Sequence, residues 1–363
     1  MKKLLSLLIT FSFTLAIGLC AGPSGHKTEK NQASSYMEEQ IYNYMYEFGN
    51  IGGHHDFGVK SYDITNDLMG EDMAMWDWGN VWFTGHYGYL ANRNQNNDLV
   101  IYTWHRYYEK IDRANWLLLN LDDLTSSQAE RNNFKGQALA IRAFAHFHLV
   151  QVFSHAYAYD PDAPGIPYIT ESSKNYSDFE PGEKINIVTD FARVKTNNES
   201  KCQNFAGKSA KSSAKGTSGI LKRGKVSDVY SRLQNDLDDA ILLLDGAGVQ
   251  AHRSYIDISV AHGIRARVAL AMEDWERAAE HAALAISTAE NNGKQLYSPE
   301  EYTADGFNSV EGSEWMWGSE ISEEESTVFA SFFSHMDARF ISYAHLGGQK
   351  LITQELYNLF PET

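Results

Sequence analysis

The sequence predicts a mainly α-helical fold, and three features of the chain lead to this prediction. Apolar residues recur every three or four positions over most of 104–152 and 226–291, which is the spacing of one helix face. Only 7 of the 363 residues are prolines, and proline interrupts helices. Two of the expected helices are separated only by Glu273 and Asp274, a turn short enough for a helical hairpin.

An export signal is expected at the start of the chain. Lys2 and Lys3 precede an apolar run that ends at Cys20, which is the pattern of a secretory signal peptide. A cysteine at the new N-terminus of an exported bacterial protein can be acylated. Residues 1–20 are therefore predicted to be a lipoprotein signal peptide, with Cys20 as the lipidation site. Because Leu19 stands where such signals favour a small residue, cleavage nearby without lipidation is the alternative.

A flexible tether is predicted after the signal, followed by the folded domain. Residues 21–35 are polar and rich in glycine, serine and lysine, a composition typical of linkers. A helix is predicted over 36–48, where Met37 and Ile41 follow helical spacing. The domain is therefore expected to cover 36–363.

Two long helices are predicted in the centre of the chain. Trp104, Ile111 and Leu118 mark one face of the first helix. The second helix, over 134–152, is apolar on nearly every side and is expected to be buried. Arg142 lies inside it. Since arginine is seldom buried without a partner, it is expected to hold a carboxylate or backbone carbonyls rather than to act in catalysis.

Three further helices are predicted over 226–245, 257–272 and 275–291. In the last of them Ala278 and Ala285 lie two turns apart, and small residues at this spacing let a partner helix approach closely. This pattern is typical of a tetratricopeptide-like helical hairpin. The predicted fold is therefore a scaffold of such hairpins that supports long irregular loops.

One stretch, at about 175–222, does not follow the helical pattern. From Lys195 to Arg223 the chain has seven lysine or arginine residues and one acidic residue, Glu199. The stretch is also rich in serine, glycine and asparagine, so it is predicted to be a disordered basic insertion. Contact with an anionic surface is the alternative to a solvated loop.

Composition excludes several classes of function. The net charge of -16 argues against a nucleic-acid partner, because phosphate binding needs clustered lysine and arginine. The chain has only two cysteines, Cys20 and Cys202, so neither a disulfide framework nor a cysteine metal site is expected. No cofactor is predicted.

The candidate ligand-binding feature is the aromatic sequence WDWGNVWFTGHYGY at 76–89, within a region of little helical periodicity. Sugar rings stack on indole and phenol rings, and sugar hydroxyls need fixed polar partners. Ligand binding is therefore assigned to the tryptophans, two tyrosines and one amide of this loop: Trp76, Trp78, Asn80, Trp82, Tyr87 and Tyr89. Packing in the core is the alternative for each aromatic side chain, and it is the expected role of Trp315 and Trp317.

Neither a metal site nor a catalytic site is predicted. His54 and His55, followed by Asp56, are adjacent on a loop, a poor geometry for a metal unless a third partner lies near. His146 and His148 are two apart on a helix, so their side chains point to different sides of it. Neither pair has the spacing of a helical zinc site. A serine nucleophile elbow, a phosphate loop and a zinc-protease motif are all missing from the sequence. Acidic residues beside the aromatic loop leave a glycosidase as a third hypothesis.

A series of short motifs resembles a known family. In chain order they are Trp104…Tyr108-x-x-Ile111-x-x-Ala114-Asn115, Gly136-x-Ala138-x-x-x-Arg142-Ala143-Phe144-x-x-Phe147-x-Leu149, Pro164-Gly165-Ile166-Pro167, Arg223-Gly224-x-x-Ser227-x-x-Tyr230, and Ala261-x-x-x-x-Arg265-Ala266 with Asp274-Trp275-x-x-Ala278. With the signal cysteine before them, these motifs resemble the SusD/RagB family of outer-membrane nutrient-binding lipoproteins.

This resemblance implies a location, partners and a function. Members are lipid-anchored on the outer membrane of Bacteroidetes-like bacteria, have no enzymatic activity, and serve polysaccharide utilization. They pass captured oligosaccharide or another nutrient to a SusC-like TonB-dependent transporter. The leading hypothesis is therefore a surface glycan-binding lipoprotein. The alternative is a helical-repeat scaffold that binds a protein or peptide.

The resemblance also has a limit at the C-terminal end. The sequence stops at Thr363, whereas members usually continue through a further C-terminal part. It is therefore expected to represent the N-terminal part of the family fold, in a truncated member.

Overall fold

The computed structural model of the chain describes most of the predicted helical domain. The described residues are 32–42, 53–70, 72–75, 82–94, 96–125, 127–170, 223–248, 250, 252–304, 310–319 and 328–360. The predicted signal peptide with Cys20, the basic insertion at about 175–222, and the loop residues Trp76, Trp78 and Asn80 lie outside these residues.

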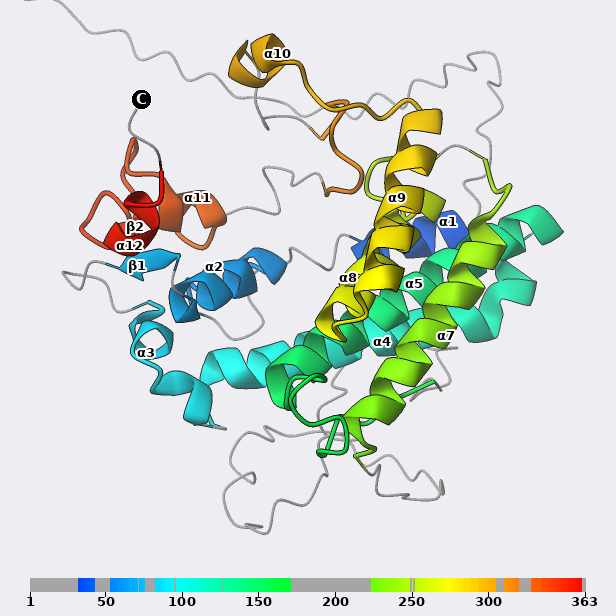
Figure 1. Ribbon diagram of the computed structural model, residues 1–363, viewed down its shortest axis with the longest axis horizontal. Coiled ribbons are helices and arrows are strands. Elements are labelled where there is room, and N and C mark those ends of the chain that lie inside the picture. Colours follow the sequence, from blue (N-terminus) through cyan, green and yellow to red (C-terminus); the bar gives the residue numbers. More distant parts are fainter. Residues whose placement is uncertain are drawn as a thin grey trace, which may run out of the picture. The chain divides into compact units, whose positions relative to one another are not determined.

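Long helices that pack one against the next in chain order form the centre of the fold (Figure 1). They are α4 (Asp98–Leu124), α5 (Gln128–Phe153), α7 (Val226–Leu244), α8 (Ile258–Ala271) and α9 (Trp275–Asn291). The mainly α-helical prediction is confirmed. The predicted bounds of α7, α8 and α9 agree with the observed ones to within one residue.

Polar side chains mark where four of these helices begin. Asn97, Ser127, Asp257 and Asp274 each accept a hydrogen bond from a backbone N–H in the first turn of α4, α5, α8 and α9 respectively. Such a cap pairs one of the backbone donors that a helix start leaves without a partner. The caps thus fix helix starts that hydrophobic spacing alone locates only approximately.

Helix α5 is the buried centre of this array, as its apolar composition predicts. Gly136 lets it approach α7 closely. A Cβ atom at this position would lie 2.7 Å from Leu244 Cγ and 3.1 Å from the carbonyl oxygen of Ala240. The absence of a side chain at Gly136 is therefore part of the contact between the two helices.

A buried polar network joins α5, α7 and α4. The Arg142 guanidinium donates two hydrogen bonds of 2.7 Å to the Asp236 carboxylate and one of 3.0 Å to the side-chain oxygen of Asn115. The Tyr168 hydroxyl donates to the same carboxylate at 2.6 Å. The expectation that Arg142 is a structural partner of a carboxylate is confirmed.

Helices α8 and α9 form the predicted hairpin (Figure 1). Glu273 adopts φ +59° in the turn between them, a left-handed conformation that is uncommon for residues with a side chain. Ala278, Ala285 and Ala289 are the buried residues of α9, whereas Trp275 is 63% exposed. The small residues of α9 thus face α8, as the alanine spacing indicates.

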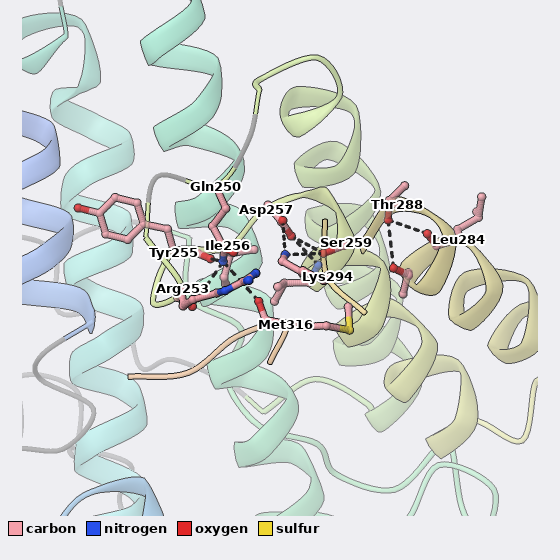
Figure 2. A network of polar contacts seen from close by, with 12 residues as sticks. Gln250, Arg253, Tyr255, Ile256, Asp257, Ser259, Leu284, Thr288, Lys294 and Met316 are labelled. Atoms are coloured by element: carbon pink, nitrogen blue, oxygen red, sulfur yellow. Dashed lines mark hydrogen bonds and ion pairs between the residues drawn. The ribbon is translucent and has the colours of Figure 1, made fainter. Parts of the chain in front are cut away.

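A second polar network surrounds the start of α8 (Figure 2). Asp257 forms a buried ion pair of 2.5 Å with Lys294, which also donates to the Ser259 hydroxyl at 3.1 Å. Gln250 donates to the carbonyl oxygen of Met316 at 3.4 Å. These contacts connect the residues after α9, and the segment around Met316, to the loop before α8.

The tryptophans after α9 help to anchor that segment. Trp317 Nε1 donates to the carbonyl oxygen of Ser254 at 2.7 Å. The Trp317 ring meets Phe144 of α5 edge-to-face, with ring centroids 5.2 Å apart. Trp315 is half-buried. For Trp317 the contacts agree with the predicted packing role.

The N-terminal part of the domain begins earlier than predicted. Helix α1 (Gln32–Tyr36) continues into the π-helix η1 (Met37–Tyr42), and both contact α4. Ala33 is fully buried, so the predicted tether is too long at its C-terminal end. Residues 36–42 are helical as predicted, and residues 43–48 lie outside the described residues.

Helix α2 (Val59–Met69) falls in a region where the sequence predicts only irregular loops. The buried residues of α2 include Ser61 and Thr65 as well as Leu68. Because two of these core positions carry polar side chains, the hydrophobic period that signals a helix is weak here. The Ser61 hydroxyl donates to the backbone carbonyl oxygen of His55, and the Thr65 hydroxyl donates to that of Ser61.

Short elements complete the described fold. Helix α3 (Thr84–Tyr87) and the 3-10 helix η3 (Ala91–Arg93) follow strand β1 (Met73–Met75), while α10 (Pro299–Ala304), α11 (Phe332–Met336), strand β2 (Lys350–Ile352) and α12 (Gln354–Tyr357) follow α9. Strands β1 and β2 pair antiparallel, with Met73 opposite Ile352 and Met75 opposite Lys350. This pairing places the residues just before the aromatic loop beside the C-terminal part of the described chain. None of the helices described is both long and apolar enough to cross a bilayer.

Candidate ligand-binding site

Three segments that are distant in sequence meet in one group of rings. Residues 53–58, 82–90 and 328–350 contribute the aromatic–histidine cluster, which consists of His54, His55, Phe57, Trp82, Phe83, Phe329, His335 and Tyr343. Ring contacts and the hydrogen bonds of His54 with Tyr343 and His335 join the first segment to the third.

One side of the cluster is partly open. His54, Trp82, Phe329 and Tyr343 are half-buried. The Trp82 ring centroid lies 5.7 Å from that of His54 and 6.2 Å from that of Tyr343. Phe329 is nearly parallel to His54 at 5.9 Å. Half-buried rings keep part of their surface available for stacking, so this group can accept a flat apolar face.

The other side of the cluster is closed. Phe57, Phe83 and His335 are 6%, 4% and 0% exposed. The His335 ring stacks on Tyr343 with centroids 5.0 Å apart and on Phe57 at 5.3 Å, and it meets Phe83 edge-to-face at 5.1 Å. The closed layer therefore supports the open rings.

Polar contacts of His335 fix its protonation state. Its Nε2 donates to the backbone carbonyl oxygen of His54 at 2.9 Å, so this nitrogen carries the proton. Burial, with help from the charge of Lys350, lowers the pKa of His335 to about 3. The ring is therefore neutral at physiological pH, with a lone pair on Nδ1.

A buried lysine lies next to this layer. Lys350 Nζ donates to the carbonyl oxygens of His335 and Gly348, both at 3.4 Å, and lies 5.3 Å from the centroid of the Phe83 ring. Burial lowers the pKa of Lys350 to about 8. Its hydrogen bonds and its contact with an aromatic face compensate in part for the lost hydration.

The backbone of the aromatic loop is strained at two aromatic residues. Phe83 and Tyr89 have φ values of +69° and +56°, a left-handed region in which a bulky residue is an outlier. The buried ring of Phe83 and a hydrogen bond of 2.6 Å from the Tyr89 hydroxyl to the carbonyl oxygen of Met69 hold these conformations. Such strain concentrates at functional sites, where the surroundings enforce it.

The predicted ligand-binding residues that the structure describes lie in different surroundings. Trp82 belongs to the open side of the cluster, while Tyr87 and Tyr89 are 38% and 46% exposed on the same loop. Sequence reasoning did not find Phe329 and Tyr343, which lie in a region without a recognisable motif, and it considered His54 only as a metal ligand. The His54–Tyr343 hydrogen bond joins residues 289 positions apart, a contact that no local pattern encodes.

The histidines considered as metal ligands do not converge. His146 Nδ1 donates to the carbonyl oxygen of Arg142 at 2.9 Å, and its Nε2 accepts from the N–H of Ile169 at 3.1 Å. His148 instead packs among other rings, including Phe144 at 4.4 Å. Across the described part of the chain, no group of three or more histidine, cysteine, aspartate or glutamate side chains could hold a metal ion.

A hollow of about 390 Å³ lies elsewhere, where the chain leaves and re-enters the described part of the fold. Its lining is Ile166, Tyr168, Gly224, Asp228, Val229, Ser231 and Arg232. The Tyr168 ring stacks on His146 at 3.8 Å, and its hydroxyl is bound to Asp236. The one aromatic ring of this lining is thus already engaged, so the aromatic–histidine cluster is the better candidate for sugar stacking.

Comparison with known proteins gives the family. Residues 26–270 match the SusD-like family model, whose description is starch-binding and associating with the outer membrane. The chain belongs to the SusD-like family. The resemblance carried by the sequence motifs is thereby confirmed. No curated protein matches this sequence.

Solved SusD-like structures share the fold. A SusD-like carbohydrate-binding protein from Bacteroides vulgatus matches with a TM-score of 0.68 and 25% identity over 91% of this chain. A SusD superfamily protein from Bacteroides thetaiotaomicron matches with 0.63 and 19% over 90%, and surface glycan-binding protein A from Bacteroides uniformis with 0.56 and 15% over 90%. The SusD-like chain spans 58%, 60% and 61% of the lengths of these three proteins.

Proposed function

We propose that this SusD-like chain binds glycan at the surface of the outer membrane, with the open side of the aromatic–histidine cluster as the binding surface. The observation that carries the proposal is the convergence of the half-buried rings of Trp82, Phe329 and Tyr343 from separate segments. Exposed aromatic faces beside polar groups suit a sugar, which has apolar ring faces and a polar rim. Tyr87 and Tyr89, together with Trp76, Trp78 and Asn80 of the same loop, complete the proposed set.

In this proposal the protein is anchored to the membrane and captures glycan, and it is not an enzyme. Lipidation at Cys20 would hold the chain at the membrane, and a SusC-like TonB-dependent transporter would receive the captured oligosaccharide. The family description, which joins starch binding to the outer membrane, supports this arrangement. Within the described segments of the cluster, Asp56 is fully buried at 3.7 Å from Arg106, and Asp337 pairs with Arg339 at 2.6 Å. Arginine therefore engages both carboxylates, whereas a glycosidase needs two that are available to the sugar.

A tryptophan substitution tests the binding surface. Trp82→Ala removes a stacking ring, and we expect it to weaken glycan binding by about tenfold or more, since aromatic contacts are worth about 1 kcal/mol beyond buried area. Affinity gel electrophoresis through soluble starch, β-glucan, mannan or xyloglucan, followed by calorimetry, measures the loss. Trp275→Ala is the matched control, because Trp275 is 63% exposed on α9.

The control should bind as the unmodified chain does. Equal binding by the Trp82 variant would contradict the proposed surface. If the unmodified chain binds none of the polysaccharides but binds members of a peptide library tightly, the helical-repeat scaffold is favoured instead.

A further inference from the structure

His54 and Tyr343 are a polar pair set into the open aromatic surface. His54 Nδ1 and the Tyr343 hydroxyl are hydrogen-bonded to each other, and both residues are half-buried. Their rings lie 5.7 Å apart, and each lies about as far from Trp82. The pair therefore lies where a sugar stacked on Trp82 would present its rim.

The hydrogen bond within this pair determines what it can offer to a ligand. If Tyr343 donates to His54 Nδ1, then His54 Nε2 carries a proton and the tyrosine oxygen can accept. If His54 Nδ1 donates instead, the tyrosine hydroxyl is a free donor and His54 Nε2 can accept. In both tautomers the pair presents one donor and one acceptor. His54 Nε2 points away from the Nδ1 that binds Tyr343, so the donor and the acceptor contact two different hydroxyl groups of a sugar. A carboxylate only accepts and would leave the acceptor of the pair without a partner.

A single buried residue, His335, holds both members of the pair. Its Nε2–H binds the backbone carbonyl oxygen of His54 at 2.9 Å, and its ring stacks on Tyr343 with an interplanar angle of 22°. The same ring contacts Phe57 and Phe83. His335 thus touches all three segments that form the aromatic–histidine cluster, and it is fully buried.

We infer that the His54–Tyr343 pair recognises hydroxyl groups of an uncharged sugar stacked on Trp82, and that His335 is the positioning residue that sets the geometry of the pair. This inference rests on the proposed glycan-binding function. It adds two polar groups to the stacking surface, and it assigns a role to the buried His335, which does not contact the ligand.

Tyr343→Phe tests the pair directly, because it removes the hydroxyl and keeps the ring. Loss of a neutral hydrogen bond should weaken binding by about two- to tenfold, with an unchanged melting temperature. The probes are soluble starch, β-glucan, mannan and xyloglucan in affinity gels, and calorimetry with whichever of them binds. Tyr159→Phe, at a residue 78% exposed outside the cluster, is the matched control and should bind normally.

Three substitutions of His335 separate positioning from packing. His335→Phe keeps the stacked ring but loses the donor, and His335→Gln keeps a donor at the place of Nε2 but loses the ring. His335→Leu loses both. We expect the order of affinity to be unmodified chain, then the Gln and Phe variants, then the Leu variant. Partial rescue by Gln is not expected of a residue that only fills space. His345→Gln, at an exposed histidine of the same segment, is the control.

The outcomes separate this inference from the proposed function. If Trp82→Ala weakens binding while the Tyr343 and His335 variants keep full affinity, the inference is wrong and the proposed stacking surface is still supported. Equal loss in all three folded His335 variants, without rescue by Gln, overturns the positioning role. Binding of none of the four polysaccharides by the unmodified chain overturns the proposed function and the inference with it.

Discussion

At the scale of single residues, burial sets the charge state of several histidines. His146 and His335 are buried and His148 is half-buried, and loss of hydration lowers the pKa of each to about 3. The physical cause is that a charged imidazole loses its water on burial, whereas the neutral ring loses less. The surrounding side chains keep these histidines neutral, so that they act as hydrogen-bonding and stacking groups. The sequence alone does not reveal this role.

These three histidines make the stability of the folded chain depend on pH. Between pH about 6.5 and about 3 the unfolded chain binds protons at these sites and the folded chain does not, so stability falls as the pH falls. Each site contributes about 1.4 kcal/mol per pH unit inside this window. We expect the melting temperature measured by circular dichroism to drop clearly between pH 7 and pH 5.

One variant checks the origin of this slope. His148→Phe removes a titrating group from an aromatic environment and should reduce the slope by about 1.4 kcal/mol per pH unit, the contribution of one site. A melting temperature that stays constant from pH 7 to pH 5 in the unmodified chain would contradict the prediction.

At the scale of elements, the local sequence decides where a helix forms, whereas the contacts between helices depend on how well their side chains pack together. The predicted helices α7, α8 and α9 lie within one residue of their observed bounds because apolar residues at helical spacing run through each of them. Helix α2 was missed because Ser61 and Thr65 occupy buried positions. The close contact of α5 with α7 depends on Gly136, whose importance is visible only when Leu244 is placed opposite it.

Two glycine substitutions in helices should therefore have opposite effects. Gly136→Val introduces atoms that clash with Leu244 and Ala240, and we expect it to lower the free energy of unfolding by about 1–3 kcal/mol or more. Gly263→Ala on α8 meets no heavy atom within 4 Å and should raise it by about 0.5–1 kcal/mol through reduced chain entropy. Urea unfolding monitored by fluorescence measures both, and a neutral Gly136→Val would show that α5 and α7 can separate without cost.

At the scale of the whole molecule, family and location come from different parts of the chain. The family match over 26–270 concerns the helical domain, whereas anchoring is predicted from the segment that ends at Cys20. The described helices do not supply a membrane span. The proposed attachment to the outer membrane is lipidation of Cys20.

Lipid labelling in a Bacteroides host tests this attachment. The unmodified chain should incorporate labelled palmitate and sediment with membranes, and Cys20→Ser should abolish both. Cys202→Ser is the matched control and should keep the label. Persistence of label in the Cys20 variant would refute lipidation at that residue.

The sequence by itself determined the helical class and the family, because hydrophobic period and short motifs are local properties that the chain carries wherever it lies. Only the tertiary structure decided which rings share a surface. Trp82 lies beside His54 and Tyr343, which Phe329 also contacts, and the buried His335 holds His54 and Tyr343 in place. His335 and His54 are 281 positions apart, and packing, rather than sequence spacing, brings them together.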